Sequence, residues 1–281
     1  MNAFMVGIDI SKDKFDAAFA DGGKWREKTF LNAARGHRAF AAWLRGAAPQ
    51  GGAHACMEAT GRYAEALAEF LHGAGFTVSV VNPARVKAFG QSELSRAKTD
   101  RADARLIARF AKSQPPRPWT PPPPERKKLQ SLMRHRDALL ADRRRHENRL
   151  DGADPFVIAS LRRVVKALDK EILSVERQTR RHLAAHPPLR QDAELLATIP
   201  GIGATTASVI LAEAPALRDY ASASALAAFA GLVPRHRQSG SSVRGRSRLS
   251  KTGSARLRRA LYMPAVVAMK RNPILRVFAE R

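Results

Sequence analysis

The stretch KTDRADARLIARF, residues 98–110, places two carboxylates, Asp100 and Asp103, directly ahead of an apolar helical pattern. In a helix, residues three apart share one face, so the two carboxylates would lie side by side. The apolar residues that follow would give the same helix a buried face. The stretch therefore predicts an acidic pair tied to a packed helix, which forms either a cation site or salt bridges with neighbouring Arg and Lys residues.

The composition indicates a polyanionic partner. The chain of 281 residues carries 49 Lys and Arg against 25 Asp and Glu, a net charge of +24 that is far more than solubility requires. Its single cysteine, Cys56, excludes an internal disulfide framework and a cysteine-based zinc site. No stretch approaches the roughly 20 apolar residues of a membrane span, and the N-terminus lacks a signal-peptide pattern. We expect a cytoplasmic protein that contacts nucleic acid and no membrane.

The first 113 residues alternate between strand and helix patterns. A first strand at 4–10 alternates aliphatic residues with Gly7 and Asp9, which sets Asp9 on the face opposite the aliphatic side chains. Similar patterns predict strands at 14–20, 24–31, 53–57 and 76–81, and helices at 32–46, 63–72, 84–89 and over the acidic stretch. Three strands followed by helix, strand, helix, strand and helix is the order of an RNase H-like α/β fold.

Four carboxylates are expected to meet in that fold. Asp9 would lie in the middle of the first strand and Glu58 at the end of the fourth, with Asp100 and Asp103 packed over the same end. A single carboxylate is usually solvated or paired, but four that converge cannot all stay ionised without cations. Oxygen-only ligands suit Mg²⁺ or Mn²⁺, and two such ions can stabilise the attacking and leaving oxygens of phosphoryl transfer.

Prolines and a helical arm follow this first domain, 1–113. QPPRPWTPPPP, residues 114–124, predicts a stiff extended linker. Residues 125–188 predict two long helices, and the second carries a heptad seam at Ile158, Leu161, Val165, Leu168, Ile172, Val175 and Thr179. The pattern fits an intramolecular hairpin or, in the interpretation we favour, a coiled-coil arm for dimerisation or nucleic-acid contact. A mainly helical C-terminal domain, 189–281, would come next.

The C-terminal domain begins with LLATIPGIGATTASVILA, residues 195–212, in which a Pro-Gly-Ile-Gly turn separates two apolar helices. This is the pattern of a helix-hairpin-helix. Gly201 and Gly203 would let backbone N–H groups and the N-terminus of the second helix point at a phosphate. We expect the turn to bind the DNA backbone.

A basic segment follows at 235–259, RHRQSGSSVRGRSRLSKTGSARLRR, with nine Lys or Arg and no acid. It predicts a phosphate-binding loop that gives affinity for nucleic acid through Arg235, Arg237, Arg244, Arg246, Arg248 and Lys251. A serine activated by this arginine field is a candidate nucleophile, and the pattern leaves open Ser239, Ser241, Ser242, Ser247, Ser250 and Ser254. Tyr262 is a rival nucleophile, but its place in an apolar helical run predicts a core residue.

Seven segments together resemble one family, the DEDD-type insertion-sequence transposases that are relatives of the Piv DNA invertase. The segments cover almost the whole chain in the family's order: GIDISKDKFD (7–16), CMEATGRY (56–63), VVNPARVKAF (80–89), AKTDRADARLIARF (97–110), TIPGIGATTASVILAE (198–213), FAGLVPRHRQSG (229–240) and RRALYMPAVVAMKRNP (258–273). The resemblance implies a RuvC-like N-terminal domain with Asp9, Glu58, Asp100 and Asp103 as metal ligands. It also implies Ser239 as the nucleophile, which forms a covalent phosphoserine–DNA link before strands are exchanged and rejoined.

The resemblance implies partners as well. These are DNA at the ends of a mobile element and at its target, a structured bridge RNA that acts as a guide, and a homo-oligomer, dimer or tetramer, in which two subunits complete one site. A bacterial, nucleoid-associated enzyme would follow. Family members usually continue a few tens of residues beyond the Asn-Pro pair at 272–273, whereas this sequence ends at Arg281. The resemblance therefore bears more firmly on the fold than on activity.

Two other functions remain open from the residues alone. A RuvC-like, metal-dependent endonuclease that uses water as its nucleophile would need only the four carboxylates. A non-catalytic nucleic-acid-binding protein would need only the basic segments. The long basic, serine-rich segment argues against the endonuclease, and the early end of the sequence keeps the non-catalytic alternative open.

Overall fold

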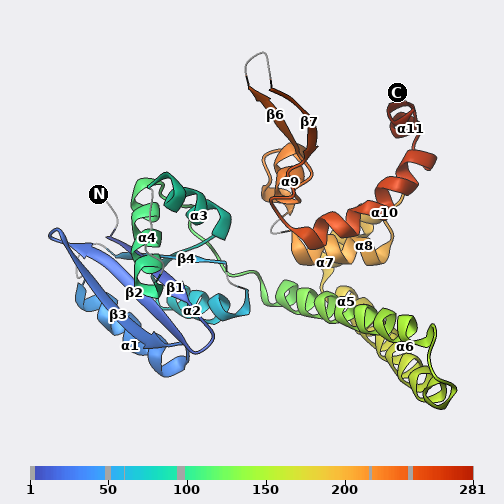
Figure 1. Cartoon of the computed structure of the whole chain (residues 1–281), viewed down its shortest axis with the longest axis horizontal. Helices are drawn as coiled ribbons and strands as arrows, with labels where there is room; N and C mark the ends of the chain where they lie inside the picture. The colour runs from blue at the N-terminus through green and yellow to red at the C-terminus, as the bar shows by residue number, and fades with distance from the viewer. Residues whose placement is uncertain are drawn as a thin grey trace. The chain divides into compact units, whose positions relative to one another are not determined.

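The computed structural model describes residues 4–47, 52–59, 61–93, 99–214, 217–239 and 243–280. The chain divides into two compact units, residues 1–121 and 122–281 (Figure 1). Within the described residues, no helix combines the length and the apolarity that a membrane crossing requires.

The first unit is built on one five-stranded sheet. Its strands are β1 (Phe4–Ile10), β2 (Lys14–Asp21), β3 (Lys24–Leu31), β4 (Ala53–Glu58) and β5 (Thr77–Val81), in the order β3-β2-β1-β4-β5. β1 to β3 form an antiparallel meander, while β4 and β5 run parallel to β1. The predicted α/β class is confirmed, and the predicted strands lie within one residue of those observed.

Helices cover both faces of this sheet (Figure 1). They are α1 (Ala34–Ala47) and α2 (Arg62–Gly73) on one face, and α3 (Pro83–Ser92) and α4 (Asp100–Ser113) on the other. The larger core lies under α1 and α2, where the aliphatic side chains of β1 meet Phe40 and Leu67. The smaller core lies under α3 and α4 and contains Cys56, which is fully buried; burial raises the pKa of its thiol to about 12.

The proline-rich stretch begins packed against the first unit. The buried Ser79 hydroxyl on β5 donates to the Arg117 carbonyl at 2.8 Å, and the Trp119 N–H donates to the Val78 carbonyl at 2.7 Å. The Trp119 ring also contacts His72 edge-on. Part of the predicted linker, residues 116–119, is therefore held along strand β5.

The second unit is mainly helical. Its elements are α5 (Pro124–Leu150), α6 (Pro155–Ala184), α7 (Pro187–Ala197), α8 (Ala204–Glu213), a short 3₁₀ turn (Leu217–Asp219), α9 (Ala223–Phe229), β6 (Pro234–Ser239), β7 (Val243–Leu249), α10 (Ala255–Arg271) and α11 (Pro273–Ala279). A core of α5 and α8 side chains, including Leu129, Met133 and Leu211, joins the long helices to the rest of this unit.

Helices α5 and α6 form an intramolecular hairpin (Figure 1). The heptad residues Leu161, Ile172 and Val175 are buried against α5. Arg136 also pairs with Glu176 at 2.7 Å across the two helices. The intramolecular interpretation of the heptad seam thus accounts for its apolar face, and a further role in dimerisation or nucleic-acid contact stays a prediction.

The basic segment differs from the loop that was predicted. Its first part is an antiparallel β-hairpin, β6–β7, with a register irregularity between Arg235 and Arg237. Its last part is the start of α10, whose N-cap is the Ser254 side chain. Arg235, Arg246 and Arg248 therefore lie on regular strand backbone, whereas Lys251 lies in the loop before α10.

Candidate active site

Two carboxylates lie on neighbouring parallel strands of the first unit. Ile8 of β1 lies opposite Met57 of β4, so the next residues along the two strands are Asp9 and Glu58. Both belong to the sheet face that α4 covers, because Val6, Ile8 and Met57 alternate with them and point into the other core. The residues that the sequence pattern predicts as neighbours are thus neighbours in the sheet.

Gly7 brings the third carboxylate close to this pair. A Cβ on Gly7 would lie 2.1 Å from the Ala104 carbonyl oxygen and 2.3 Å from the Ala108 nitrogen. Only a residue without a side chain lets the α4 backbone lie directly on β1. Asp103 precedes the contact residue Ala104, so this close approach sets it over the end of β1 where Asp9 lies.

The start of α4 is fixed by its own cap. The Thr99 side chain accepts a hydrogen bond from the Ala102 N–H at 3.2 Å, and the Asp103 N–H donates to the Thr99 carbonyl at 2.8 Å. Asp100 and Asp103 both fall in the first turn, where the helix dipole favours negative charge. The Thr99 cap thus fixes where α4 begins, and with it the positions of Asp100 and Asp103 in the first turn.

The carboxylates act on one another electrostatically. Partial burial, with the charges of Asp103, Asp100 and Asp16 in descending order, raises the pKa of Asp9 to about 6. Burial, followed by the charges of Asp9 and Asp103, also raises the pKa of Glu58. Burial and neighbouring negative charges disfavour the ionised form of these carboxylates, and a bound cation would stabilise that form.

Lys14 and Asp16 complete the surroundings of the pair. Asp16, which is only 5% exposed, lies directly opposite Asp9 on β2 and accepts a hydrogen bond from Thr29. Lys14 donates to Asp100 at 2.9 Å and lies 3.7 Å from Asp16. The hydrogen bond between Lys14 and Asp100 lowers the pKa of Asp100 and raises that of Lys14. The site therefore contains a fifth carboxylate and one ammonium group.

The sequence pattern did not single out either residue, although a signal was present. Ser11 and Lys14 close a tight turn, with the Ser11 N–H bonded to the Lys14 carbonyl. Counting outward from that turn pairs Ile10 with Phe15 and then Asp9 with Asp16. The hairpin register, in addition to strand alternation, would have placed Asp16 beside Asp9.

A divalent cation fits the chemistry of this donor set. The side chains near Asp9 offer carboxylate oxygens, which are the ligands that hard divalent ions prefer. Within the described ranges, no three Asp, Glu, His or Cys side chains lie close enough together to hold a metal ion as they stand. The predicted carboxylates are therefore close enough to influence one another's pKa, but the described side chains do not form a complete set of metal ligands.

The serine candidates fall into three groups in the second unit. Ser239 ends β6, but its side chain lies outside the part that the structure describes, as do Ser241 and Ser242 altogether. Two others have structural roles: Ser250 accepts from the Thr252 N–H, and Ser254 caps α10. Ser247 is exposed on β7.

The predicted nucleic-acid contacts lie on or beside the hairpin and on the α7–α8 turn. Arg235, Arg246, Arg248 and Lys251 are exposed, whereas the side chains of Arg237 and Arg244 are outside the described part. Gly201 has a φ of 96°, and its Cβ position would meet the Pro264 carbonyl oxygen at 2.7 Å, so it packs the turn against α10. Gly203 faces open space at the N-terminus of α8, with no side-chain cap.

The prediction that Tyr262 is a core residue is wrong. Its side chain is 67% exposed on α10, next to Met263 at 60%. The buried residues of that helix are Leu257, Pro264 and Ala268, so its apolar run faces both inward and outward.

Comparisons with known proteins give consistent matches to both units. A family model described as "Transposase" (DEDD_Tnp_IS110) matches residues 6–153, and one described as "Transposase IS116/IS110/IS902 family" matches residues 193–280. The first covers nearly all of the sheet, the acidic helix and all of α5, and the second covers the α7–α8 turn, the basic hairpin and α10.

Individual proteins are similar over most of their length. The pilin gene-inverting protein of Moraxella bovis is 34% identical over 283 aligned residues, which cover 100% of this chain and 88% of that protein. The pilin gene-inverting protein of Moraxella lacunata matches to the same extent. A transposase for insertion sequence element IS1328 of Yersinia enterocolitica is 29% identical over 239 residues, 73% of this chain and 68% of that protein.

Proposed function

The chain belongs to the IS110 family of transposases, and from that premise we propose that it recombines DNA at specific sites with a carboxylate metal site and a serine nucleophile. As a member of this family it is an enzyme that cuts and rejoins DNA, and the family implies dependence on a divalent metal ion. The finer assignments below are our proposal.

One observation carries the proposal. Asp9 and Glu58 come one residue after a paired position on adjacent parallel strands, and Gly7 lets the helix that bears Asp103 lie directly on the same strand. The charges of Asp103 and Asp100 oppose the ionisation of Asp9. A fold that places like charges together at such a cost suits a site that is completed by cations.

We propose Asp9, Glu58, Asp100 and Asp103 as the ligands of Mg²⁺ or Mn²⁺. A bound divalent ion would supply Lewis-acid stabilisation of charge on the scissile phosphate. Lys14 would then compete with the ion for Asp100, because its ammonium group contacts Oδ2 of that carboxylate. The strand order, an antiparallel meander followed by two parallel strands, supports an RNase H-like fold for this unit.

Ser239 is the nucleophile that we propose. Its oxygen would bond to the scissile phosphorus while the bond to one deoxyribose oxygen breaks, leaving a phosphoserine link and a free deoxyribose hydroxyl. Neighbouring exposed cations, among them Arg246 and Arg248, support this assignment because they can stabilise charge on the transferring phosphate.

The basic hairpin and the turn before α8 would hold the nucleic acid. Phosphate contacts would come from Arg235, Arg237, Arg244, Arg246, Arg248 and Lys251, and from backbone N–H groups at Gly201 and Gly203 in a helix-hairpin-helix. Within this proposal, residues 1–113 form the domain that carries the carboxylates, and residues 114–124 are the linker that follows it. Residues 125–188 form a coiled-coil arm, and residues 189–281 form the domain that carries the serine. A structured guide RNA and a homo-oligomer, dimer or tetramer, complete the proposal.

A covalent adduct tests the nucleophile. Full-length protein is incubated with Mg²⁺ and a nicked suicide substrate that carries the element end, and the protein–DNA adduct is measured on a denaturing gel. We expect an adduct with wild type and with Ser247→Ala, and none with Ser239→Ala, Asp9→Asn or EDTA. An adduct that persists in Ser239→Ala would overturn the assignment, and Mg²⁺-dependent cleavage without any adduct would indicate water as the nucleophile.

Sequencing of co-purified RNA tests the guide. An RNA transcribed beside the gene, with loops that match both donor and target DNA, is the expected result. Full recombination by RNA-free protein would contradict it.

A further inference from the structure

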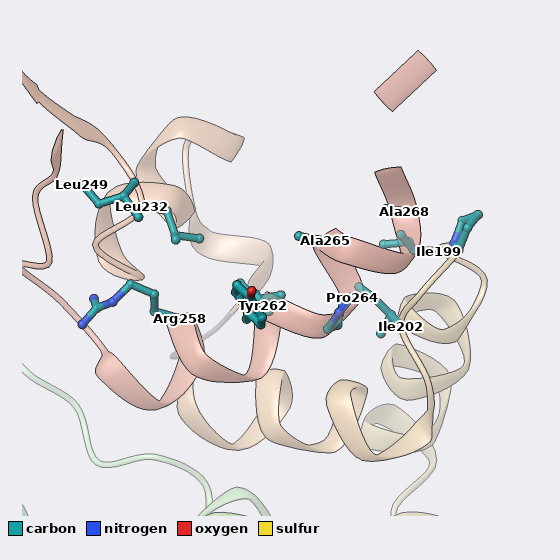
Figure 2. Close-up of a pocket in the computed structure, with 11 residues that line it drawn as sticks. Ile199, Ile202, Leu232, Leu249, Arg258, Tyr262, Pro264, Ala265 and Ala268 are labelled. Atoms are coloured by element: carbon teal, nitrogen blue, oxygen red, sulfur yellow. The ribbon is translucent and has the colours of Figure 1, made fainter. Parts of the chain in front are cut away.

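An apolar groove of about 360 Å³ opens on the second unit, beside the basic hairpin (Figure 2). Its lining comes from the α7–α8 turn, the α9–β6 loop, the end of β7 and α10: Ile199, Pro200, Ile202, Leu232, Leu249 and Tyr262 with its α10 neighbours. Nothing in the roles assigned above uses this groove. Its volume lies at the lower end of that of small-ligand pockets, about 300–1,000 Å³.

The groove follows from two local constraints in the sequence. Pro264 lies inside α10 and cannot donate a backbone hydrogen bond to the preceding turn of the helix. Gly201, at φ 96°, packs against the Pro264 backbone, which brings Ile199 and Ile202 alongside α10. An apolar wall is thus built between the Pro-Gly-Ile-Gly turn and the helix, and it is left open.

Tyr262 presents a flat aromatic surface in this wall. It lies between Leu232 on one side and Ile202 on the other, as Figure 2 shows. It is 67% exposed, and Leu249 at the end of β7 is 49% exposed. A large aromatic face that is open to solvent stacks on other flat rings, and nucleobases of every kind offer such a face.

The charge around the groove selects its partner. Between Tyr220 and Ala279 the chain has 12 Lys and Arg and no Asp or Glu. Arg258 lines the groove itself and holds the surrounding loop by donating to the Ala230 carbonyl at 3.0 Å. Arg248 and Lys251 are exposed on either side of Leu249. An apolar floor with these cations beside it suits a polyanion that carries apolar flat groups.

We propose that this groove binds one unpaired nucleobase, stacked on Tyr262, from a strand whose phosphates lie on the basic hairpin. The inference rests on the proposed function, because it takes the second unit to bind nucleic acid, and it adds a site for a base outside the helix. A base displaced from a duplex and a base in an RNA loop present the same chemistry to the groove.

The rival occupant is a second copy of the chain. Helix α11 exposes Ile274 at 80% and Phe278 at 75%, and such a helix could enter an apolar groove. However, the same helix carries Arg276 and follows Arg271, so it would bring positive charge close to the cations Arg248, Lys251 and Arg258. Charge complementarity therefore favours nucleic acid.

Binding to hairpin oligonucleotides tests the site. Two hairpins with the same paired stem, each closed by a non-nucleotide linker, are compared by anisotropy with full-length protein in EDTA. One is fully paired and the other carries a single unpaired 2-aminopurine in its stem, and each is made as DNA and as RNA. We expect wild type to prefer the unpaired form about tenfold in at least one of the two nucleic acids. The fluorescence of the 2-aminopurine should fall when the wild-type protein binds the oligonucleotide. Tyr262→Phe and the neighbouring control Met263→Ala should keep both effects.

Tyr262→Ala should abolish the preference and the change in fluorescence while leaving affinity for the paired hairpin within about twofold. An unchanged preference in Tyr262→Ala, or equal affinity of wild type for both hairpins, would overturn the inference while leaving the proposed function standing. Failure of wild type to bind any hairpin would overturn the proposed function as well. A lower sedimentation coefficient for free Tyr262→Ala, with no loss of base preference, would assign the groove to a second copy.

Discussion

At Asp9 the fold surrounds a carboxylate with conditions that oppose its charge. Its pKa is raised to about 6 by burial and by Asp103, Asp100 and Asp16. A group whose pKa is higher in the folded state binds more protons there than in the unfolded chain between about pH 4 and pH 6. The stability of the metal-free protein should therefore fall as the pH rises through that window, and the penalty should persist above it.

Asp9→Asn should remove this penalty. In EDTA at about pH 8 we expect the variant to be more stable than wild type by about 1–2 kcal/mol, a figure discounted for partial solvent screening. The difference should vanish near about pH 4, where Asp9 is largely protonated in the folded state. Thermal denaturation across this pH range measures it. Asp13→Asn, which removes one negative charge at an exposed position in the β1–β2 turn, is the control. A gain in stability as large as that of Asp9→Asn would show that the effect is not specific to Asp9.

Gly7 is the residue on which the approach of α4 depends. Gly7→Ala would force a methyl group to within 2.1 Å of the Ala104 carbonyl oxygen, and the helix would have to move away from β1. We expect a loss of about 1–3 kcal/mol in the free energy of unfolding, measured with urea. Gly46→Ala, in α1 with open space around it, should instead be neutral or stabilising. Equal effects of the two substitutions would contradict the close approach.

Among the elements, α4 connects stability to the site through its cap. Thr99→Ala should cost about 1 kcal/mol in urea denaturation, because the Ala102 N–H loses its acceptor. It should also weaken Mn²⁺ binding measured by calorimetry, since the first turn bears Asp100 and Asp103. Ser222→Ala removes the matching cap of α9 in the other unit. A comparable loss of Mn²⁺ affinity in that variant would show that the effect is not local to α4.

The hydrogen bonds that hold the proline-rich stretch against β5 can be tested in the same way. Ser79→Ala removes the donor to the Arg117 carbonyl and leaves the buried His54 without its hydroxyl partner. We expect the Trp119 amide, which donates to Val78, to exchange its hydrogen with solvent faster, as measured by mass spectrometry. Ser92→Ala, which removes an exposed hydroxyl at the end of α3, should leave that exchange unchanged.

Pattern was sufficient for most elements of the first unit and insufficient for parts of the second. The aliphatic alternation of β1 predicts the strand and the face of Asp9, since one side of a sheet must be buried. The hairpin β6–β7 was not predicted, because its arginines and serines show no apolar alternation. The exposure of Tyr262 depends on the packing of Gly201 against Pro264, a contact between distant parts of the sequence.

Over the whole molecule, charge dominates how the chain should meet nucleic acid. A net charge of +24 predicts affinity that falls steeply with salt. Replacing Arg246 and Arg248 together by Ala should make the slope of log K against log salt shallower by roughly 2, because each phosphate that is no longer neutralised reduces the slope by about 0.9. Fluorescence anisotropy of a labelled duplex, titrated with protein over a series of KCl concentrations, measures the slope.

The matched control removes two exposed arginines of the first unit, Arg35 and Arg38 on α1. We expect the slope to change less in that variant than in the hairpin variant. An equal change of slope in the two variants would show that the hairpin makes no more of the phosphate contacts than α1 does.

The burial of Cys56 has a practical consequence for the intact enzyme. It is the chain's single cysteine, it is fully enclosed beneath α4, and its pKa of about 12 keeps the sulfur as a thiol at neutral pH. Maleimide reagents should therefore leave the folded wild-type chain unlabelled. A cysteine introduced at any exposed position would then take a fluorophore or spin label alone, so distances within the working recombinase can be followed without first removing a native thiol.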